Sequence, residues 1–258
     1  MFRSALPVKE RILLYGGSGS GKSSAAFHIA RFYQQTNTPG KIYIADTDSA
    51  AYRTYEAGYK DLDNIEVLPI YDWADMLKLG KMTFGVNDWL SVDFISSSWQ
   101  MIQDWYADQL FDHDMSTQIM FTRAKIEEQN RDIKSREKAP QALDAWRDWP
   151  AINGLYFRWI SSLFAREKVH IIGTSPAKEV GDRTPPQTLA LVKSIGLLPS
   201  GQKDLMHAFH TTIFMNKVNR DYVFTVVKDR ERDLVIGKSM VRFPISYLQD
   251  VAGWVVEE

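Results

Sequence analysis

The sequence predicts an α/β fold, in which a mostly parallel sheet carries helices on both faces and ends in a late antiparallel strand pair. Short apolar runs alternate with segments of helical periodicity through most of the chain, which is typical of parallel strands joined by helical crossovers. Two more apolar runs follow each other late in the chain, as antiparallel neighbours do. A length of 258 residues with 45% hydrophobic residues is typical of one large domain.

Each element of this fold has its own sequence signal. Apolar runs predict parallel strands at 11–15, 41–46, 65–70, 89–94 and 169–174. Helical spacing and helix-stop residues predict helices at 22–35, 49–58, 72–82 and 97–111. The late strand pair is expected at 210–215 and 222–228. Residues 112–150 are rich in Arg, Lys, Glu and Gln, so we expect a charged helical insertion within a single domain spanning 1–258.

Composition excludes several kinds of protein. The chain has no cysteine, which rules out disulfides, thiolate catalysis and cysteine-bound zinc. Its five histidines lack the spacing of a histidine metal site. No apolar run approaches the roughly 20 residues of a membrane span, and the N-terminus lacks the apolar core of a signal peptide. We therefore expect a cytoplasmic protein with no membrane partner.

Charge is divided unevenly along a chain whose net charge is −1. Residues 43–114 hold 4 basic and 14 acidic residues, whereas residues 176–242 hold 11 basic and 7 acidic residues. A polyanion is therefore expected to meet the C-terminal half. Solvated surfaces of opposite sign are the alternative explanation of the same asymmetry.

The strongest motif is a phosphate-binding loop between the first predicted strand and the first predicted helix. Residues 16–23 match the pattern G-x-x-x-x-G-K-[ST], and strand–loop–helix is the context that this motif requires. Glycines let backbone N–H groups surround phosphates, and the helix N-terminus adds positive potential. Lys22 is expected to reach the β- and γ-phosphates and Ser23 to ligate Mg²⁺. The predicted ATP-binding residues are Gly16, Gly17, Ser18, Gly19, Ser20, Gly21, Lys22 and Ser23.

Carboxylates that would complete such a site follow two other strands. Asp93 ends the run 89–93 and is the best candidate for the second metal residue, beside Ser23. Phe94 follows it, where many P-loop ATPases have a glutamate base. Asp46 and Asp48 end the second strand, and residues two apart on an extended segment face the same side. Either of these two could point at the γ-phosphate, and a solvated loop is the alternative for one of them.

These residues together resemble the RecA-like branch of P-loop ATPases, which includes recombinases and hexameric replicative helicases. The stretch IYIADTDSAAYRTYEAGYKDLDNIEVLPI resembles the recombinase segment that carries the catalytic acid, and the resemblance places that role on Asp48, with a shorter side chain than the usual glutamate. WLSVDFISSSW resembles the Walker B strand and gives Asp93 the metal role. HIIGTSPAKE resembles the strand that senses the γ-phosphate, which implies Thr174 and Ser175.

The C-terminal third extends the resemblance. Residues 176–200 fall where recombinases carry a mobile DNA-binding loop, whose cations here are Lys178, Arg183 and Lys193. The late strands resemble those in which a K-x-R pair reaches the ATP of a neighbouring subunit, and Lys228 and Arg230 match that pair. Compact size and the insertion look most like phage-encoded RecA-like ATPases of single-strand annealing or recombination systems.

The resemblance implies a DNA-stimulated, Mg²⁺-dependent ATPase that acts in DNA recombination or single-strand annealing. Its implied partners are other copies of the chain, in a head-to-tail ring or filament, and single-stranded DNA. A ring-forming helicase or DNA-packaging motor has the same active site and stays an alternative. Two further alternatives are a nucleotide-gated binding module and a small-molecule phosphotransferase. The binding module stays an alternative because Asp48 stands where the family has the catalytic glutamate.

Overall fold

The computed structural model describes residues 9–132, 147–166, 168–182, 184–241 and 243–251. Within them the chain forms two compact units. The sheet unit comprises Met1–Tyr71, Met82–Ser97 and Phe164–Glu258, and the helical unit comprises Asp72–Lys81 and Ser98–Leu163. In the described part of the chain, no helix combines the length and the apolar character needed to cross a membrane.

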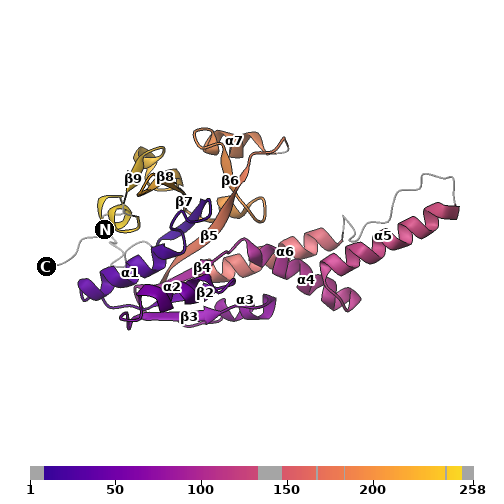
Figure 1. Cartoon of the computed structure of the whole chain (residues 1–258), viewed down its shortest axis with the longest axis horizontal. Coiled ribbons are helices and arrows are strands. Elements are labelled where there is room, and N and C mark those ends of the chain that lie inside the picture. Colours follow the sequence, from indigo (N-terminus) through magenta and orange to yellow (C-terminus); the bar gives the residue numbers. More distant parts are fainter. Residues whose placement is uncertain (1–8, 133–146, 167, 183, 242, 252–258) are drawn as a thin grey trace, which may run out of the picture. The chain divides into compact units, whose positions relative to one another are not determined.

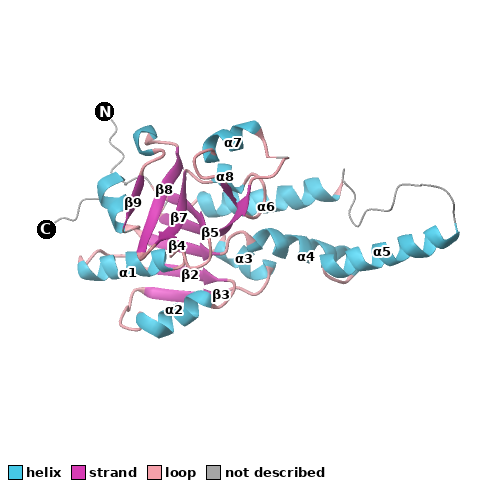
Figure 2. Ribbon diagram, turned by 45° about the horizontal axis from the view of Figure 1, so that its top comes forward, coloured by secondary structure: helices cyan, strands magenta, loops and turns pink. Residues whose placement is uncertain are grey.

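A single mixed sheet organises the sheet unit, as Figure 2 shows. Over the described residues its nine strands run in the order β3-β2-β4-β5-β1-β7-β8-β9, with β6 paired to β5. The strands are β1 (Arg11–Gly16), β2 (Ile42–Asp46), β3 (Ile65–Pro69), β4 (Asp88–Asp93), β5 (Val169–Glu179), β6 (Leu197–Pro199), β7 (Thr211–Val218), β8 (Asp221–Asp229) and β9 (Ser239–Val241).

The predicted fold class is confirmed. Strand β1 pairs in parallel with β5 and β7, β2 pairs in parallel with β3 and β4, and β4 pairs in parallel with β5. The late pair, β7 and β8, is antiparallel. Because the parallel strands all point the same way, the carboxyl ends of β1, β2, β4 and β5 meet at one edge of the sheet, where ligands of such folds bind.

Four α-helices of the sheet unit connect these strands: α1 (Ser24–Gln35), α2 (Ala50–Gly58), α7 (Pro186–Val192) and α8 (Leu205–Ala208). A 3₁₀ helix (Asp233–Val235) and a π-helix (Tyr247–Val251) follow near the C-terminal end. Helix α1 is amphipathic, and its buried face packs into one hydrophobic core with β1, β2 and β8 (Figure 1). That packing fixes the start of α1 beside the end of β1.

The helical unit contains α3 (Trp73–Leu79), α4 (Ser97–Phe111), α5 (Met115–Asp132) and α6 (Asp148–Phe164). Its core is aromatic: Trp73 and Trp159 meet edge to face with ring centroids 5.3 Å apart. The indole N–H of Trp159 donates to the Met76 carbonyl oxygen over 2.7 Å, which satisfies the buried polar end of that side chain. The unit therefore has a core of its own.

The charged segment 112–150 contains all of α5 and the first turn of α6. Residues 133–146 lie outside the described part of the chain. Helix α6 begins at Asp148, ahead of the expected end of the insertion at residue 150. Pro150 is tolerated there because a proline in the first helical turn removes an N–H that has no partner within the helix.

Strand β5 is longer than predicted, since it continues from Thr174 to Glu179. The sequence signal stops at Pro176, which lacks a backbone N–H and normally ends a strand. Here Pro176 lies opposite Gly16, the last residue of β1, and its carbonyl oxygen accepts from Ser200 N–H at 2.8 Å. Beyond it β5 pairs with β6. The expected loop at 176–200 is thus a hairpin that contains α7.

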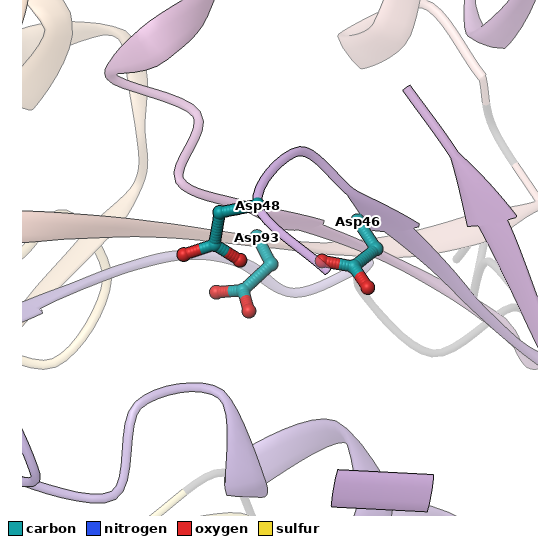
Figure 3. A group of neighbouring side chains, drawn as sticks. All are labelled: Asp46, Asp48 and Asp93. Carbon is teal, nitrogen blue, oxygen red and sulfur yellow. The ribbon is translucent and has the colours of Figure 1, made fainter. Parts of the chain in front are cut away.

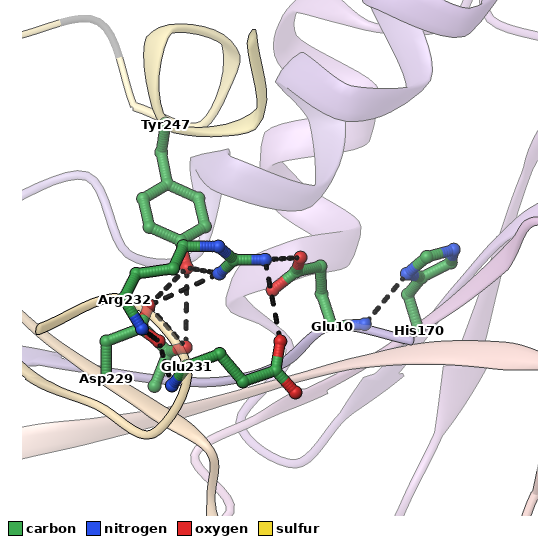
Figure 4. A network of polar contacts seen from close by, with 7 residues as sticks. Glu10, His170, Asp229, Glu231, Arg232 and Tyr247 are labelled. Atoms are coloured by element: carbon green, nitrogen blue, oxygen red, sulfur yellow. Dashed lines mark hydrogen bonds and ion pairs between the residues drawn. The ribbon is translucent and has the colours of Figure 1, made fainter. Parts of the chain in front are cut away.

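A buried network of charged groups joins three segments: the residues just before β1, the end of β8 and the π-helix at Tyr247–Val251 (Figure 4). The guanidinium of Arg232 donates to Glu10 at 2.8 Å, to Asp229 at 3.3 Å and to the Tyr247 hydroxyl at 2.9 Å. Tyr247 in turn donates to Asp229 at 3.1 Å. Burial raises the pKa of Glu10, and the Arg232 partner opposes that rise. The network holds three distant segments together.

A histidine near the start of β5, next to Glu10, stays neutral at ordinary pH. His170 is fully buried, stacks on Trp89 with centroids 4.6 Å apart, and accepts from Glu10 N–H at 3.0 Å through Nδ1. Burial, reinforced by the charge of Lys9, lowers the pKa of His170 from its ordinary 6.5 to about 3.

We expect acid to destabilise the fold through His170. The unfolded chain binds a proton near pH 6.5, whereas the folded chain binds it only near pH 3. Between these two values the free energy of unfolding therefore falls by about 1.4 kcal/mol for each unit by which the pH drops. Denaturant unfolding followed by tryptophan fluorescence measures this. In His170→Asn that contribution should be missing, and in His113→Asn it should persist. Equal pH slopes for wild type and His170→Asn would contradict the prediction.

Candidate nucleotide and metal site

The glycine-rich segment 16–23 forms a loop between the end of β1 and the start of α1, as predicted. Gly19 and Gly21 have φ angles of 70° and 89°, a conformation that favours glycine because it has no Cβ. The helix begins at Ser24, two residues later than expected. The loop thus presents backbone amides ahead of a helix N-terminus, which is the geometry of a phosphate site.

Gly16 permits the close approach of two strands. A Cβ on Gly16 would lie 2.0 Å from the carbonyl oxygen of Met215 on β7, whereas a Cβ on Gly17 would meet nothing within 4 Å. We expect Gly16→Ala to lower the free energy of unfolding by about 1–3 kcal/mol, because the strand pair must separate.

Gly17→Ala is the matched control for that substitution, since it adds the same methyl group one residue away. Chemical denaturation of both variants checks the prediction, and equal stability of the two would contradict it.

Lys22 lies over the loop that carries it. Its side chain is buried, and Nζ donates to the carbonyl oxygens of Gly16 at 3.0 Å and Gly17 at 2.7 Å and to the Ser20 hydroxyl at 3.3 Å. Burial lowers the pKa of Lys22, and the charge of Asp93 opposes that shift. The hydrogen bonds therefore hold the ammonium group against the backbone of residues 16–20.

Ser23, Asp93 and Thr174 form a hydrogen-bonded chain across three elements. One oxygen of Asp93, Oδ1, accepts from the Ser23 hydroxyl at 3.1 Å and from the Thr174 hydroxyl at 2.5 Å. The Thr174 hydroxyl also accepts from the backbone N–H of Phe94 at 2.7 Å. Thr174 is fully buried and therefore holds Asp93 in place. Ser175 beside it donates within its own segment, to the carbonyl oxygens of Pro176 or Ser200.

Three aspartates gather at this edge of the sheet (Figure 3). Asp46 and Asp93 occupy paired positions at the ends of β2 and β4, and Asp48 follows two residues after β2. One carboxylate oxygen from each lies within 4.8 Å of the others. Asp46 and Asp93 are buried and Asp48 is exposed. Burial raises the pKa of Asp93, the hydrogen bonds from Thr174 and Ser23 lower it, and the charges of Asp48 and Asp46 raise it.

A cavity of about 770 Å³ opens beside the loop and α1. Gly21, Ser24 and His28 line one side of it, and the turn between β7 and β8 supplies the other side. Arg220 of this turn and the first two residues of β8, Asp221 and Tyr222, line the cavity there. Its size falls within the range of pockets that hold small molecules. Sequence reasoning missed these three residues because only the parallel pairing of β1 with β7 brings the turn to the loop.

Lys228 and Arg230 lie away from this site. Lys228 is near the end of β8 and Arg230 follows it directly, and β8 is antiparallel to β7 and so reaches the edge where β1 begins. Lys228 Nζ donates to the carbonyl oxygens of Met206 at 2.9 Å and Phe209 at 2.5 Å, and Arg230 donates to that of His207 at 2.5 Å. Burial and the charge of Arg230 lower the pKa of Lys228 to about 8.

The cations predicted to bind DNA fall on the β5–β6 hairpin. Lys178 is exposed on β5, and Lys193 is exposed at the C-terminal end of α7. Arg183 lies outside the described residues. A second cavity, of about 440 Å³, lies between the hairpin and the segment that follows it, and is lined by Lys178 and Lys203 among others.

No family model matches the chain, and no curated protein sequence matches it. Solved structures do match. The crystal structure of the RadB recombinase has a TM-score of 0.50 and 14% sequence identity, covering 91% of this chain and 87% of that chain. The crystal structure of the flagellar accessory protein FlaH from Methanocaldococcus jannaschii has a TM-score of 0.42 and 13% identity, covering 92% and 85%. The likeness to RadB, with the observed strand order, shows a RecA-like α/β fold.

Proposed function

We propose that this protein is a RecA-like ATPase that binds ATP and Mg²⁺ at residues 16–23 and acts on single-stranded DNA in recombination or annealing. The proposal treats residues 1–258 as one ATPase domain with a charged helical insertion at about 112–150. The observation that carries it is the arrangement around the loop: the buried Lys22 ammonium donates to the carbonyl oxygens of Gly16 and Gly17, and Ser23 is hydrogen-bonded to a buried Asp93.

The side chains fit a nucleotide with its metal ion. Ser23 and Asp93 would hold Mg²⁺, which when bound neutralises phosphate charge. Oδ2 of Asp93 is buried and has no hydrogen-bond partner, so an open carboxylate oxygen is available there. Lys22 would exchange its carbonyl partners for phosphate oxygens, and the loop amides would bind the remaining ones.

The other groups of the site have separate roles in this proposal. Asp48 is exposed at the same edge and would accept a proton from the attacking water. Thr174 would position Asp93, because both of its observed hydrogen bonds fix the β4 end. The cavity beside α1 would take the nucleoside, with the Tyr222 ring available for stacking on the base.

The active site would be shared between subunits. Lys228 and Arg230 lie at the edge of the sheet opposite their own phosphate loop. In this proposal Lys228 and Arg230 therefore contact the ATP that is bound to a neighbouring copy. A head-to-tail ring or filament allows such a contact. Such a cation in trans stabilises the negative charge of the transition state.

Single-stranded DNA would bind along the β5–β6 hairpin, and we expect Lys178→Glu with Lys193→Glu to weaken that binding. Each lost phosphate contact reduces the slope of log affinity against log salt by about 0.7. Fluorescence anisotropy with a labelled oligonucleotide at several salt concentrations measures both effects. Lys60→Glu is the control, because Lys60 is an exposed lysine in the turn after α2 and outside the hairpin. An unchanged slope in the double variant would place the DNA elsewhere.

Steady-state ATP hydrolysis, measured with and without single-stranded DNA at two salt concentrations, tests the function. Hydrolysis that DNA stimulates, more strongly at low salt, is the expected result. Hydrolysis without any effect of DNA would remove the DNA part of the proposal. Absence of both ATP binding and hydrolysis would overturn it.

A further inference from the structure

The three aspartates at the carboxyl edge of the sheet, Asp46, Asp48 and Asp93, share a second feature besides their proximity. Each carboxylate is held by a hydrogen bond through one oxygen. Asp46 accepts from Tyr52 N–H at 2.9 Å, Asp48 accepts from Ala50 N–H at 3.0 Å, and Asp93 accepts from two hydroxyls through Oδ1. Their orientations are therefore fixed by the fold, as those of metal ligands are.

The second oxygens of the two buried aspartates lack partners. Oδ1 of Asp46 and Oδ2 of Asp93 are both inaccessible to solvent and without a hydrogen bond, in side chains that are 5% and 1% exposed. Leaving such oxygens unpaired is costly in a buried site, and two neighbouring carboxylates also repel each other. A ligand that binds both oxygens at once would remove both costs.

Protein cations do not fill this role among the described residues. The ion pairs found there involve other carboxylates. Lys22 acts on Asp93 electrostatically, yet its hydrogen bonds go to Gly16, Gly17 and Ser20. Lys22 therefore supplies one positive charge near three carboxylates without bonding to any of them, and a bound cation would balance the remaining negative charge.

We propose that Asp46, Asp48 and Asp93 form a site that binds one hard divalent cation in the absence of nucleotide. Their oxygens lie within 4.8 Å of one another, and two ligands of one such cation, each at about 2.4 Å from it, are never farther apart than that. An all-carboxylate set selects cations of the Mg²⁺, Ca²⁺ and Mn²⁺ class. Because this binding needs no phosphate, it goes beyond the nucleotide-dependent Mg²⁺ of the proposed function.

Titration of Mn²⁺ into nucleotide-free protein, by calorimetry and by the electron paramagnetic resonance signal of free Mn²⁺, tests the site. One Mn²⁺ per chain is expected, with displacement by Mg²⁺. Asp46→Asn, Asp48→Asn and Asp93→Asn keep the hydrogen bonds that the carboxylates accept and lose only charge and an open oxygen. Each should weaken Mn²⁺ binding by at least about tenfold, since even the loss of an outer partner costs that much.

Asp63→Asn is the matched control, because Asp63 is an exposed aspartate outside the cluster. Thermal unfolding adds a readout that does not depend on activity. In EDTA the three cluster variants should be at least as stable as the wild type, because a repulsion is relieved. Mn²⁺ should raise the melting temperature of the wild type and of Asp63→Asn, and much less that of the cluster variants.

Two results would overturn the site: no Mn²⁺ binding without nucleotide, or the same Mn²⁺ affinity in Asp46→Asn as in the wild type. ATP binding measured in EDTA with a fluorescent analogue separates this inference from the proposed function. A chain that binds Mn²⁺ but no ATP would keep the cation site and overturn the ATPase. A chain that binds Mn²⁺ only together with ATP would do the reverse.

Discussion

Lys22→Ala is expected to reduce ATP turnover by at least about 100-fold, the usual effect of removing one preorganised electrostatic group from a transition state. The ammonium of Lys22 is the only cation among the described residues that donates into the loop at 16–23, through Gly16, Gly17 and Ser20. Alanine removes the charge that would meet the β- and γ-phosphates. The measurement is steady-state phosphate release at saturating ATP and Mg²⁺.

The fold should survive this change, because the partners of Lys22 are carbonyl oxygens and a hydroxyl at the rim of the loop. Circular dichroism and thermal unfolding check that point. Lys60→Ala, which removes an exposed lysine of the same size, should hydrolyse ATP at the wild-type rate. Turnover that persists in a folded Lys22→Ala protein would refute the assignment of residues 16–23 as the phosphate site.

Arg232→Met is expected to be the most destabilising of the substitutions considered, lowering the free energy of unfolding by about 3–5 kcal/mol. Arg232 lies between the carboxylates of Glu10 and Asp229, which are both 4% exposed. Methionine retains much of the side-chain volume and removes the guanidinium, so two buried negative charges lose their partner. Urea denaturation followed by tryptophan fluorescence measures the loss.

The cause of that loss can be isolated. Glu10→Gln in the Arg232→Met background should restore part of the stability, because it removes one of the unpaired charges. Without Arg232 the pKa of Glu10 loses the interaction that lowers it. Glu10 then binds a proton more readily, and the deficit relative to the wild type should shrink as pH falls.

A surface pair supplies the control for this substitution. Arg31 pairs with Asp61 in the same sheet unit, and the two side chains are 32% and 58% exposed. Arg31→Met should therefore cost far less stability, because water replaces the lost partner. Equal losses in Arg31→Met and Arg232→Met would show that burial of the network contributes nothing.

Local sequence signals accounted for much of the sheet unit. The loop predicted at 16–23 is confirmed between β1 and α1, because glycine, lysine and serine at that spacing have few structural alternatives between a strand and a helix. The strands at 11–15, 41–46, 65–70 and 89–94 are each confirmed to within one residue at either end. Parallel strands buried on both faces are nearly continuous apolar runs, and that signal needs no knowledge of the partner strand.

Several helices and strands were not predicted from the sequence, and the physical reason differs from one to the next. Helix α6 has the apolar spacing of a buried helix but follows a charged segment, and it was not predicted. The short strand β6 is three residues long and exists only through its pairing with β5. Helix α7 lies inside the same hairpin, where a loop was expected. Short elements of this kind are stabilised by tertiary contacts and leave little local pattern.

The fold class, the loop at 16–23 and the choice of Asp93 as the carboxylate that accompanies it could all be predicted from the sequence alone, and the hydrogen bond between Ser23 and Asp93 agrees with that choice. Each of these depends on residues within one strand, loop or helix. The burial of Asp46 beside Asp93 and the network of Arg232 with Glu10 follow instead from the way distant segments pack. The position of Lys228 and Arg230 away from their own loop follows from that packing as well. Strand order and register set these relations, and register is fixed by packing between segments far apart in the sequence.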